Sequence, residues 1–134
     1  MIKQISENEL FDFLKLYEAM VREIDCYKHL PSSAIAMSIL ESMQRRNFFA
    51  YGDYKDGKLI GMICGYEEDK DTWYQLGIYN LIPFRAIKMI EEVEQELKDL
   101  GYTHWTTEYS KQDDKCLAPK IGAKVQTIRY IKEI

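Results

Sequence analysis

The sequence of 134 residues has few of the features that mark secreted or metal-binding proteins. Its three cysteines, Cys26, Cys64 and Cys116, lie far apart, and no two of them form a C-x-x-C pair. This spacing argues against a zinc site or a disulfide framework and is typical of a reducing compartment. The two histidines are too few for a histidine-based metal cluster. We therefore expect no metal site.

The sequence also has no long apolar run. No uninterrupted apolar stretch approaches the ~20 residues that are needed to span a bilayer. Met1 leads directly into a polar, charged segment, so no signal peptide is visible. We expect a cytoplasmic protein that does not bind membranes.

A basic surface is missing as well. The formal net charge is −4, and Arg45 and Arg46 are the only adjacent arginines. Proteins that bind nucleic acids draw affinity from phosphates neutralised by lysine and arginine, so they carry a basic patch. We expect no nucleic-acid partner. The acidic stretch Glu67–Asp71 lacks the spacing of an EF-hand calcium loop, and we interpret it as a solvated turn.

What the sequence does contain is ordinary for a soluble globular protein. Hydrophobic residues make up 46% and charged residues 30% of the chain. A chain of this length is expected to form one domain, here residues 1–134, and to bury roughly 70% of the surface of its unfolded form.

Apolar spacing predicts two helices in the first third of the chain. Ser6 and Glu9 form a capping box, after which apolar residues recur at helical intervals from Leu10 to Ile24. Pro31 and the serines after it mark the start of a second helix. A short strand over residues 2–5 precedes the first helix.

The middle of the chain predicts three strands. Residues 48–54 and 58–66 form a hairpin around a turn in which Gly57 takes a positive φ. A third strand covers Thr72–Asn80 and leads into a long helix. Pro83 suits the first turn of that helix, and Gly101 suits the position just after its end. The predicted inner face of the helix consists of Ile87, Ile90, Val93, Leu97 and Leu100.

The last third predicts a strand over residues 103–109, a short helix near 113–120 and a final strand over 124–134. The whole order is βα(α)ββ(β)αβαβ. It predicts an α/β fold with a mixed twisted sheet flanked by helices, in which the late strand–helix–strand unit is a right-handed parallel crossover.

This order of elements resembles the GNAT superfamily of N-acetyltransferases. The resemblance covers nearly the whole chain and is clearest in KDGKLIGMICGY (55–66), in the run from Trp73 to Tyr109 and in KIGAKVQTIRYIKEI (120–134). Short proteins of this layout are also common in phage genomes. The resemblance implies an opening between the fourth and fifth strands in which acetyl-CoA lies. It also implies a pyrophosphate grip, Q/R-x-x-G-x-G/A, where backbone N–H groups and the positive end of a helix meet the anion.

The sequence departs from this family pattern at two places. Counting back from Gly101 aligns the pyrophosphate motif with Leu81–Ala86, of which only Ala86 fits, and no glycine occurs from Ile78 to Leu100. The family's general-acid tyrosine corresponds to Ala118, which cannot transfer a proton. We therefore favour a GNAT-fold protein with a degraded acetyl-CoA signature that acts as a non-catalytic binding or assembly module.

Two functional hypotheses follow. In the first, a protein partner or a second copy of the chain binds the apolar turn through Leu81, Ile82 and Phe84. In the second, the protein is an active acyl-CoA-dependent N-acetyltransferase for an amine of a small molecule or protein. Acetyl-CoA would then be held in a non-standard way by Ile78, Tyr79, Asn80, Arg85 and Ala86.

Two further residues are candidates for proton transfer in the second hypothesis. His104 and Glu108 alternate along a predicted strand and so point to the same face. A base and a carboxylate on one face could accept a proton from an amine. A hydrogen-bonded sheet face with no catalytic role is the alternative.

Overall fold

The computed structural model describes residues 2–23, 27–110 and 127–134, with the side chains of 108–110 and 127–130 left aside. Its strands are β1 (Ile2–Gln4), β2 (Phe49–Lys55), β3 (Lys58–Asp69), β4 (Thr72–Asn80), β5 (His104–Ser110) and β6 (Thr127–Glu133). Its main helices are α1 (Leu10–Arg22), α2 (Ser32–Ser42) and α3 (Ala86–Asp99), with short 3₁₀ turns η1 (Glu7–Glu9) and η3 (Pro83–Arg85). Ile24, Ala118 and the predicted helix near 113–120 lie outside the described residues.

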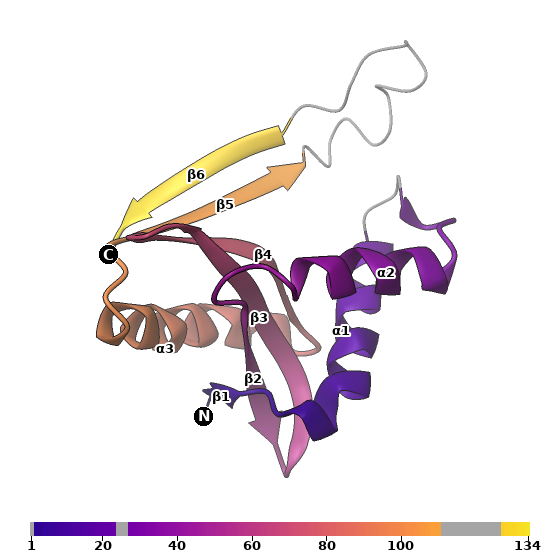
Figure 1. Ribbon diagram of the computed structural model, residues 1–134. Coiled ribbons are helices and arrows are strands. Elements are labelled where there is room, and N and C mark those ends of the chain that lie inside the picture. The colour runs from indigo at the N-terminus through magenta and orange to yellow at the C-terminus, as the bar shows by residue number, and fades with distance from the viewer. Residues whose placement is uncertain (1, 24–26, 111–126) are drawn as a thin grey trace.

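The strands form one sheet in the order β1-β2-β3-β4-β5-β6. Every neighbouring pair is antiparallel except β4 and β5, which are parallel and joined through α3. A parallel pair needs such a crossover because the chain must return to the same end of the sheet. The predicted mixed sheet flanked by helices is confirmed; its parallel pair is β4 with β5, whereas β5 and β6 are antiparallel (Figure 1).

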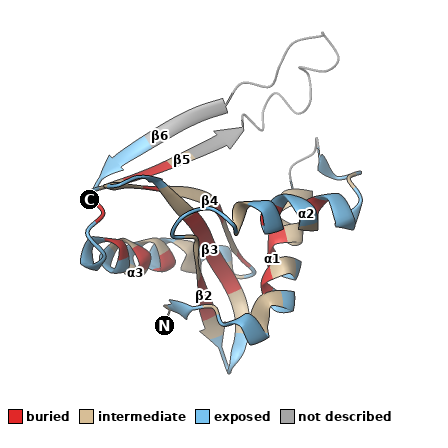
Figure 2. Cartoon of the chain, in the orientation of Figure 1, coloured by how far each residue is buried: buried red, intermediate tan, exposed pale blue. Residues whose placement is uncertain are grey.

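The helices cover both faces of this sheet (Figure 1). On one face, α3 packs Met89, Val93 and Leu97 against strand residues such as Trp73 and Trp105. On the other face, α1 and α2 cover Met62 and Cys64 with Phe13, Leu16, Tyr17, Ile35 and Ile39. The buried residues concentrate on the central strands and the inward helix faces, as Figure 2 shows.

Two predicted turns are confirmed by their backbone angles. In the hairpin between β2 and β3, Asp56 has a φ of 52° and Gly57 a φ of 77°, the pair of positive angles that a tight type I′ turn requires. Gly101 has a φ of 97° directly after α3, as expected for a residue that ends a helix.

Two local predictions are wrong. Glu67 does not lie in a solvated turn, because β3 continues to Asp69 and the turn is confined to Lys70 and Asp71. Ile87 and Leu100 do not face the core: they are 68% and 54% exposed. Six residues at 100° each put Ile87 about 120° around the helix from buried Val93, and Leu100 follows the last turn of α3.

Within residues 2–23, 27–110 and 127–134, no helix is both long enough and apolar enough to cross a membrane.

Candidate functional site

β4 and β5 pair over only part of their length. Their register runs from Thr72 opposite His104 to Gln75 opposite Thr107 and goes no further. At this point the register between β3 and β4 shifts as well: Cys64 lies opposite Gly77 but Gly65 lies opposite Gln75, so Leu76 is an extra residue. A bulge of this kind bends a strand and ends its pairing. Beyond it, β5 and β6 diverge from β4 (Figure 1).

The main chain of β4 beyond the bulge is therefore paired on one edge only among the described residues. Leu81 N–H donates to the Ile60 carbonyl at 2.9 Å, which continues the β3 register of Asn80 with Gly61. In an antiparallel pair, hydrogen-bonded positions alternate with positions whose N–H and C=O point away from the partner. Tyr79 is thus bonded to β3, whereas the N–H and C=O groups of Ile78 and Asn80 point toward the β5 side.

Asn80 ends β4 and starts the corner that leads into α3. Its buried side chain accepts a hydrogen bond from Ile82 N–H at 2.8 Å, an Asx turn. Its amide nitrogen donates to Asp53 at 2.9 Å and to the Met89 sulfur at 2.9 Å. A Cβ on Gly61 would overlap this amide, so the glycine on β3 makes room for it.

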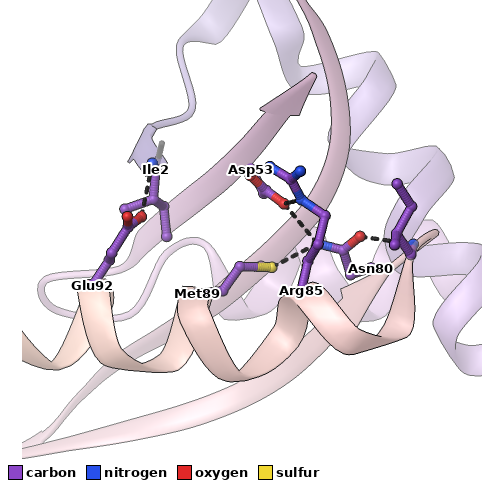
Figure 3. Close-up of polar contacts among 7 residues, drawn as sticks. Ile2, Asp53, Asn80, Arg85, Met89 and Glu92 are labelled. Atoms are coloured by element: carbon purple, nitrogen blue, oxygen red, sulfur yellow. Dashed lines mark hydrogen bonds and ion pairs between the residues drawn. The ribbon is translucent and has the colours of Figure 1, made fainter. Parts of the chain in front are cut away.

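Arg85 is held in an internal ion pair at the same corner (Figure 3). Its Nε and Nη2 atoms donate to the two carboxylate oxygens of Asp53 at 2.6 and 2.8 Å. Asp53 lies on β2 and is only 4% exposed. The hydrogen bonds from Arg85, followed by that from Asn80, lower the pKa of the Asp53 carboxyl, and the same pairing raises the pKa of Arg85. Bidentate arginine–carboxylate pairs are among the stronger hydrogen-bonded contacts in proteins.

A second carboxylate also lies near this guanidinium. Glu92 on α3 contributes to the raised pKa of Arg85 by its charge and accepts a hydrogen bond from Ile2 N–H at 3.0 Å (Figure 3). Arg85 is therefore paired with one carboxylate at the corner, and the charge of a second, about two turns further along α3, acts on it at longer range. Its charge is not available as a net positive centre.

Most backbone donors of the corner are already engaged. Leu81 N–H is bonded to Ile60, Ile82 N–H to Asn80, Arg85 N–H to the Ile82 carbonyl at 3.0 Å, and Ala86 N–H to the Pro83 carbonyl. Pro83 has no N–H. Over this stretch of the described chain, Phe84 N–H is the one backbone donor with no acceptor.

The outer side of the corner is apolar and exposed. Leu81, Phe84 and Ile87 are 57%, 80% and 68% exposed, respectively, and we call these three residues the corner patch. Two of the predicted contact residues, Leu81 and Phe84, belong to it, while Ile82 is half-buried. Ile87 was assigned to the core by its spacing and joins the patch instead.

The remaining predicted site residues lie elsewhere. His104 begins β5 opposite Thr72, and its Nδ1 contacts Thr103 Oγ1 at 2.9 Å. At about 3.3 Å per residue, β4 separates this position from Asn80 by roughly 26 Å. Glu108 is paired with Arg129 of β6 through the backbone. Tyr79 donates from its hydroxyl to Glu23 at 3.3 Å, on the α1 side of the sheet.

A second polar cluster lies near the start of β4. Glu67 accepts hydrogen bonds from the Tyr102 hydroxyl at 2.9 Å, from the Asn47 amide at 3.0 Å and from Arg46 at 3.2 Å. These contacts, Tyr102 first, lower the pKa of the Glu67 carboxyl. The cluster joins the chain before β2, strand β3 and the segment between α3 and β5. Among the described residues, no three His, Cys, Asp or Glu side chains are grouped to hold a metal ion.

These observations test whether the corner fits the diphosphate of acetyl-CoA, the cofactor that the family resemblance implies. A diphosphate needs several free N–H donors or an unpaired cation at a helix N-terminus. The corner has one free N–H among residues 81–86 and an arginine whose guanidinium faces a buried carboxylate. It does not fit a diphosphate. The outward groups of Ile78 and Asn80 do fit an amide-bearing chain.

The whole chain resembles solved N-acetyltransferase structures. It superimposes on PaiA N-acetyltransferase from Thermoplasma acidophilum in complex with coenzyme A with a TM-score of 0.68 and 12% identity, covering 100% of this chain and 98% of that one. With the ribosomal-protein-S18-alanine N-acetyltransferase from Escherichia coli the TM-score is 0.68 at 11% identity, and the match covers 100% of this chain and 93% of that one. With a GNAT family acetyltransferase from Elizabethkingia anophelis with acetyl-CoA bound the TM-score is 0.64 at 13% identity, and the match covers 100% of this chain and 97% of that one.

At these identities the resemblance establishes the fold, so the predicted GNAT fold is confirmed. No family model matches the sequence, and no curated protein matches it.

Proposed function

We propose that this chain is a non-catalytic GNAT-fold module that binds a protein partner at the strand-to-helix corner, through the corner patch. The observation that carries the proposal is the Asp53–Arg85 ion pair, bidentate at 2.6 and 2.8 Å. In this pair Arg85, the residue that we expected to bind the pyrophosphate in place of the glycine-rich motif, is already bonded to a carboxylate. The carboxylate of Asp53 also balances the charge of this guanidinium.

Electrostatics support this reading. A diphosphate that took the Nε–Nη2 edge of Arg85 would have to displace Asp53 and leave a 4% exposed carboxylate without its partner, and at the remaining N–H groups it would meet a guanidinium whose charge Asp53 already balances. Removing one member of a buried ion pair is strongly unfavourable, because the remaining charge keeps the cost of its desolvation. The partial positive charge at the start of α3 acts over the first turn only. Asp53 brings a carboxylate to that turn through its pair with Arg85.

The apolar exposure of the corner supports a protein partner. Phe84 is the most exposed large hydrophobic residue of the described chain, and Leu81 and Ile87 stand three residues before and after it. Aromatic side chains are enriched in the centres of protein interfaces, where they bury apolar area with little loss of side-chain entropy. Clustered exposed apolar residues mark such surfaces more often than single ones do.

A second candidate function is acyl-CoA-dependent N-acetyltransfer to a small-molecule or protein amine. One observation favours it: the outward N–H and C=O groups of Ile78 and Asn80 remain available on the β5 side, in the fold of structures solved with coenzyme A or acetyl-CoA. This candidate needs a phosphate grip outside the corner. It therefore makes the opposite prediction for cofactor binding.

Calorimetric titration of the protein with acetyl-CoA separates the two functions. The proposal predicts no binding heat and no rise in melting temperature at about 1 mM acetyl-CoA. A cofactor with a Kd of about 10 μM would stabilise the folded form by about 2.7 kcal/mol under these conditions, a rise of several degrees. Saturable binding with such a rise would remove the non-catalytic proposal.

A paired substitution tests the partner-binding part. Phe84→Asp places a charge at the centre of the corner patch, while Phe11→Asp does the same at another exposed phenylalanine, on α1 (68% exposed). Both variants should melt close to the parent protein. Only Phe84→Asp should abolish binding of a partner identified with the parent protein, measured by calorimetry. Equal loss in both variants would show that the corner is not the contact surface.

A further inference from the structure

We propose that the partner engages this corner with an extended peptide segment, which adds as a strand to the open edge of β4 at Ile78 and Asn80 and places an apolar side chain on the corner patch. This inference rests on the proposed function and specifies the kind of partner. It joins two features that follow each other in the chain. One is a main-chain edge for which residues 2–23, 27–110 and 127–134 supply no strand partner, and the other is an exposed apolar surface.

The main-chain edge supplies the pairing. β4 has β3 on one side as far as Asn80, and its described pairing with β5 ends at Gln75. Ile78 and Asn80 therefore present alternating N–H and C=O groups in the pattern that one edge of a β-strand offers. Extended peptides bind such edges by completing the ladder, with side-chain pockets giving specificity.

The position of the open edge of β4 within the sheet favours a single extended peptide segment as its binding partner. β4 lies inside the sheet order, between β3 and β5, so its open edge faces the diverging β5 and not the outer rim of the sheet (Figure 1). A second folded copy could offer only its edge strand β1 or β6, each of which is attached to a whole sheet. A single extended segment needs only one strand spacing, about 4.8 Å, beside β4.

The corner determines the chemistry of the segment. Arg85 is committed to Asp53, and Phe84 N–H is the one free backbone donor between Leu81 and Ala86 in the described structure. An anionic group gains little there, whereas an apolar side chain can cover Leu81, Phe84 and Ile87. We therefore expect a segment with an apolar residue at the end that reaches the corner.

Selection from a displayed library of linear peptides tests this inference. The parent protein should select peptides with an apolar consensus, and the best of these is then synthesised and measured by calorimetry. N-methylation at alternate peptide residues, which removes the N–H groups facing β4, should weaken binding at least tenfold. Methylation of the intervening residues should change it much less. Failure to select any peptide, or equal effects of the two methylated forms, would overturn the inference.

Variants of the protein locate the peptide. Phe84→Asp should weaken binding at least tenfold, and Phe11→Asp should not change it. In the parent protein, hydrogen exchange of the Ile78 and Asn80 amides should slow on peptide binding, while that of Tyr79, already bonded to β3, should not change. Slowing at Phe11 and not at Ile78 would place the peptide elsewhere and contradict the inference. The measurements with methylated peptides and the hydrogen-exchange data use the parent protein. They therefore test the inference even if a variant protein fails to fold.

The test also separates this inference from the proposed function. Saturable acetyl-CoA binding would contradict both, because the edge of β4 would then serve a cofactor chain. Absence of acetyl-CoA binding together with absence of any selected peptide would contradict the strand-addition inference alone. Concentration-dependent dimerisation that Phe84→Asp abolishes would replace the peptide by a second copy and likewise contradict it.

Discussion

The two ends of β4 have different roles in the molecule. From Thr72 to Gln75 the strand lies between β3 and β5, and Trp73 is fully buried in edge contact with Trp105, their ring centroids 6.1 Å apart. Beyond the extra residue Leu76 the strand pairs with β3 alone among the described residues, and it runs into a corner where Phe84 is 80% exposed. The first half of β4 therefore belongs to the core of the sheet, and its last residues form the proposed binding surface.

The difference arises from a few local residues. Gly65 and Gly77 flank the bulge on the two strands, and a Cβ on Gly65 would overlap the Tyr74 carbonyl and the Trp73 ring. The bulge turns the strand away from β5, and the outward groups of Ile78 and Asn80 have no strand partner in the part of the chain that the structure describes. A strand that is regular to its end would bury this edge and leave no surface at the corner.

The largest effect is expected at the closed end. Trp73→Ala removes a 0% exposed ring that packs against Trp105 and α3, and it should lower the free energy of unfolding by about 3–5 kcal/mol. Urea denaturation at neutral pH measures this change. A loss below about 1 kcal/mol would show that the closed end is not the stable part of the sheet.

An intermediate effect is expected for the ion pair at the open end. Asp53→Asn removes charged hydrogen bonds to Arg85 and should cost about 1.5–3 kcal/mol at pH 7. The matched control, Asp56→Asn in the exposed hairpin turn, should change stability by less than about 0.5 kcal/mol. The comparison uses urea unfolding of both variants and the parent.

The same substitution predicts a pH dependence. The folded-state pKa of Asp53 lies below its unfolded value of about 3.9 because Arg85 donates to its carboxylate. The stabilisation is therefore complete above that unfolded value and is lost as the pH falls through the lower folded value. The stability difference between the parent and Asp53→Asn should be constant from pH 7 to about pH 5 and shrink below about pH 4. A difference that grows on acidification would contradict the assigned ion pair.

The smallest effect is expected for the corner patch. Ile87→Ala should change the free energy of unfolding by less than about 0.5 kcal/mol, because this side chain is 68% exposed. Leu97→Ala, on the same helix but 0% exposed, should cost about 2–5 kcal/mol. Comparable losses in the two variants would mean that Ile87 is packed and that the corner patch does not exist as described.

Local sequence signals predicted much of the fold. Thr72–Asn80 was predicted with the bounds that β4 has, because a turn precedes it and the break at Leu81–Pro83 follows it. Gly57 and Gly101 were predicted from their position between periodic segments, and both have positive φ.

Contacts between distant residues were not predictable in this way. Asp53 and Arg85 are 32 positions apart, and nothing in either neighbourhood indicates the other. Glu67 was placed in a turn because its neighbours are acidic, but partners from residues 46–47 and Tyr102 keep it in β3. The predicted inner face of α3 was wrong at Ile87. Apolar spacing alone did not identify Met89 as the buried residue of the first turn, where it contacts Asn80.

We infer that the strand-to-helix corner does not hold a diphosphate, because all but one of its described backbone donors and the Nε–Nη2 edge of Arg85 are engaged within the protein. Amide NMR spectra of the ¹⁵N-labelled protein during titration with coenzyme A, up to millimolar concentration, test it most directly. The account predicts no saturable shift for the amides of Phe84, Arg85 and Ala86 or for the Arg85 side-chain Nε–H. Saturable shifts of these four signals together would contradict it.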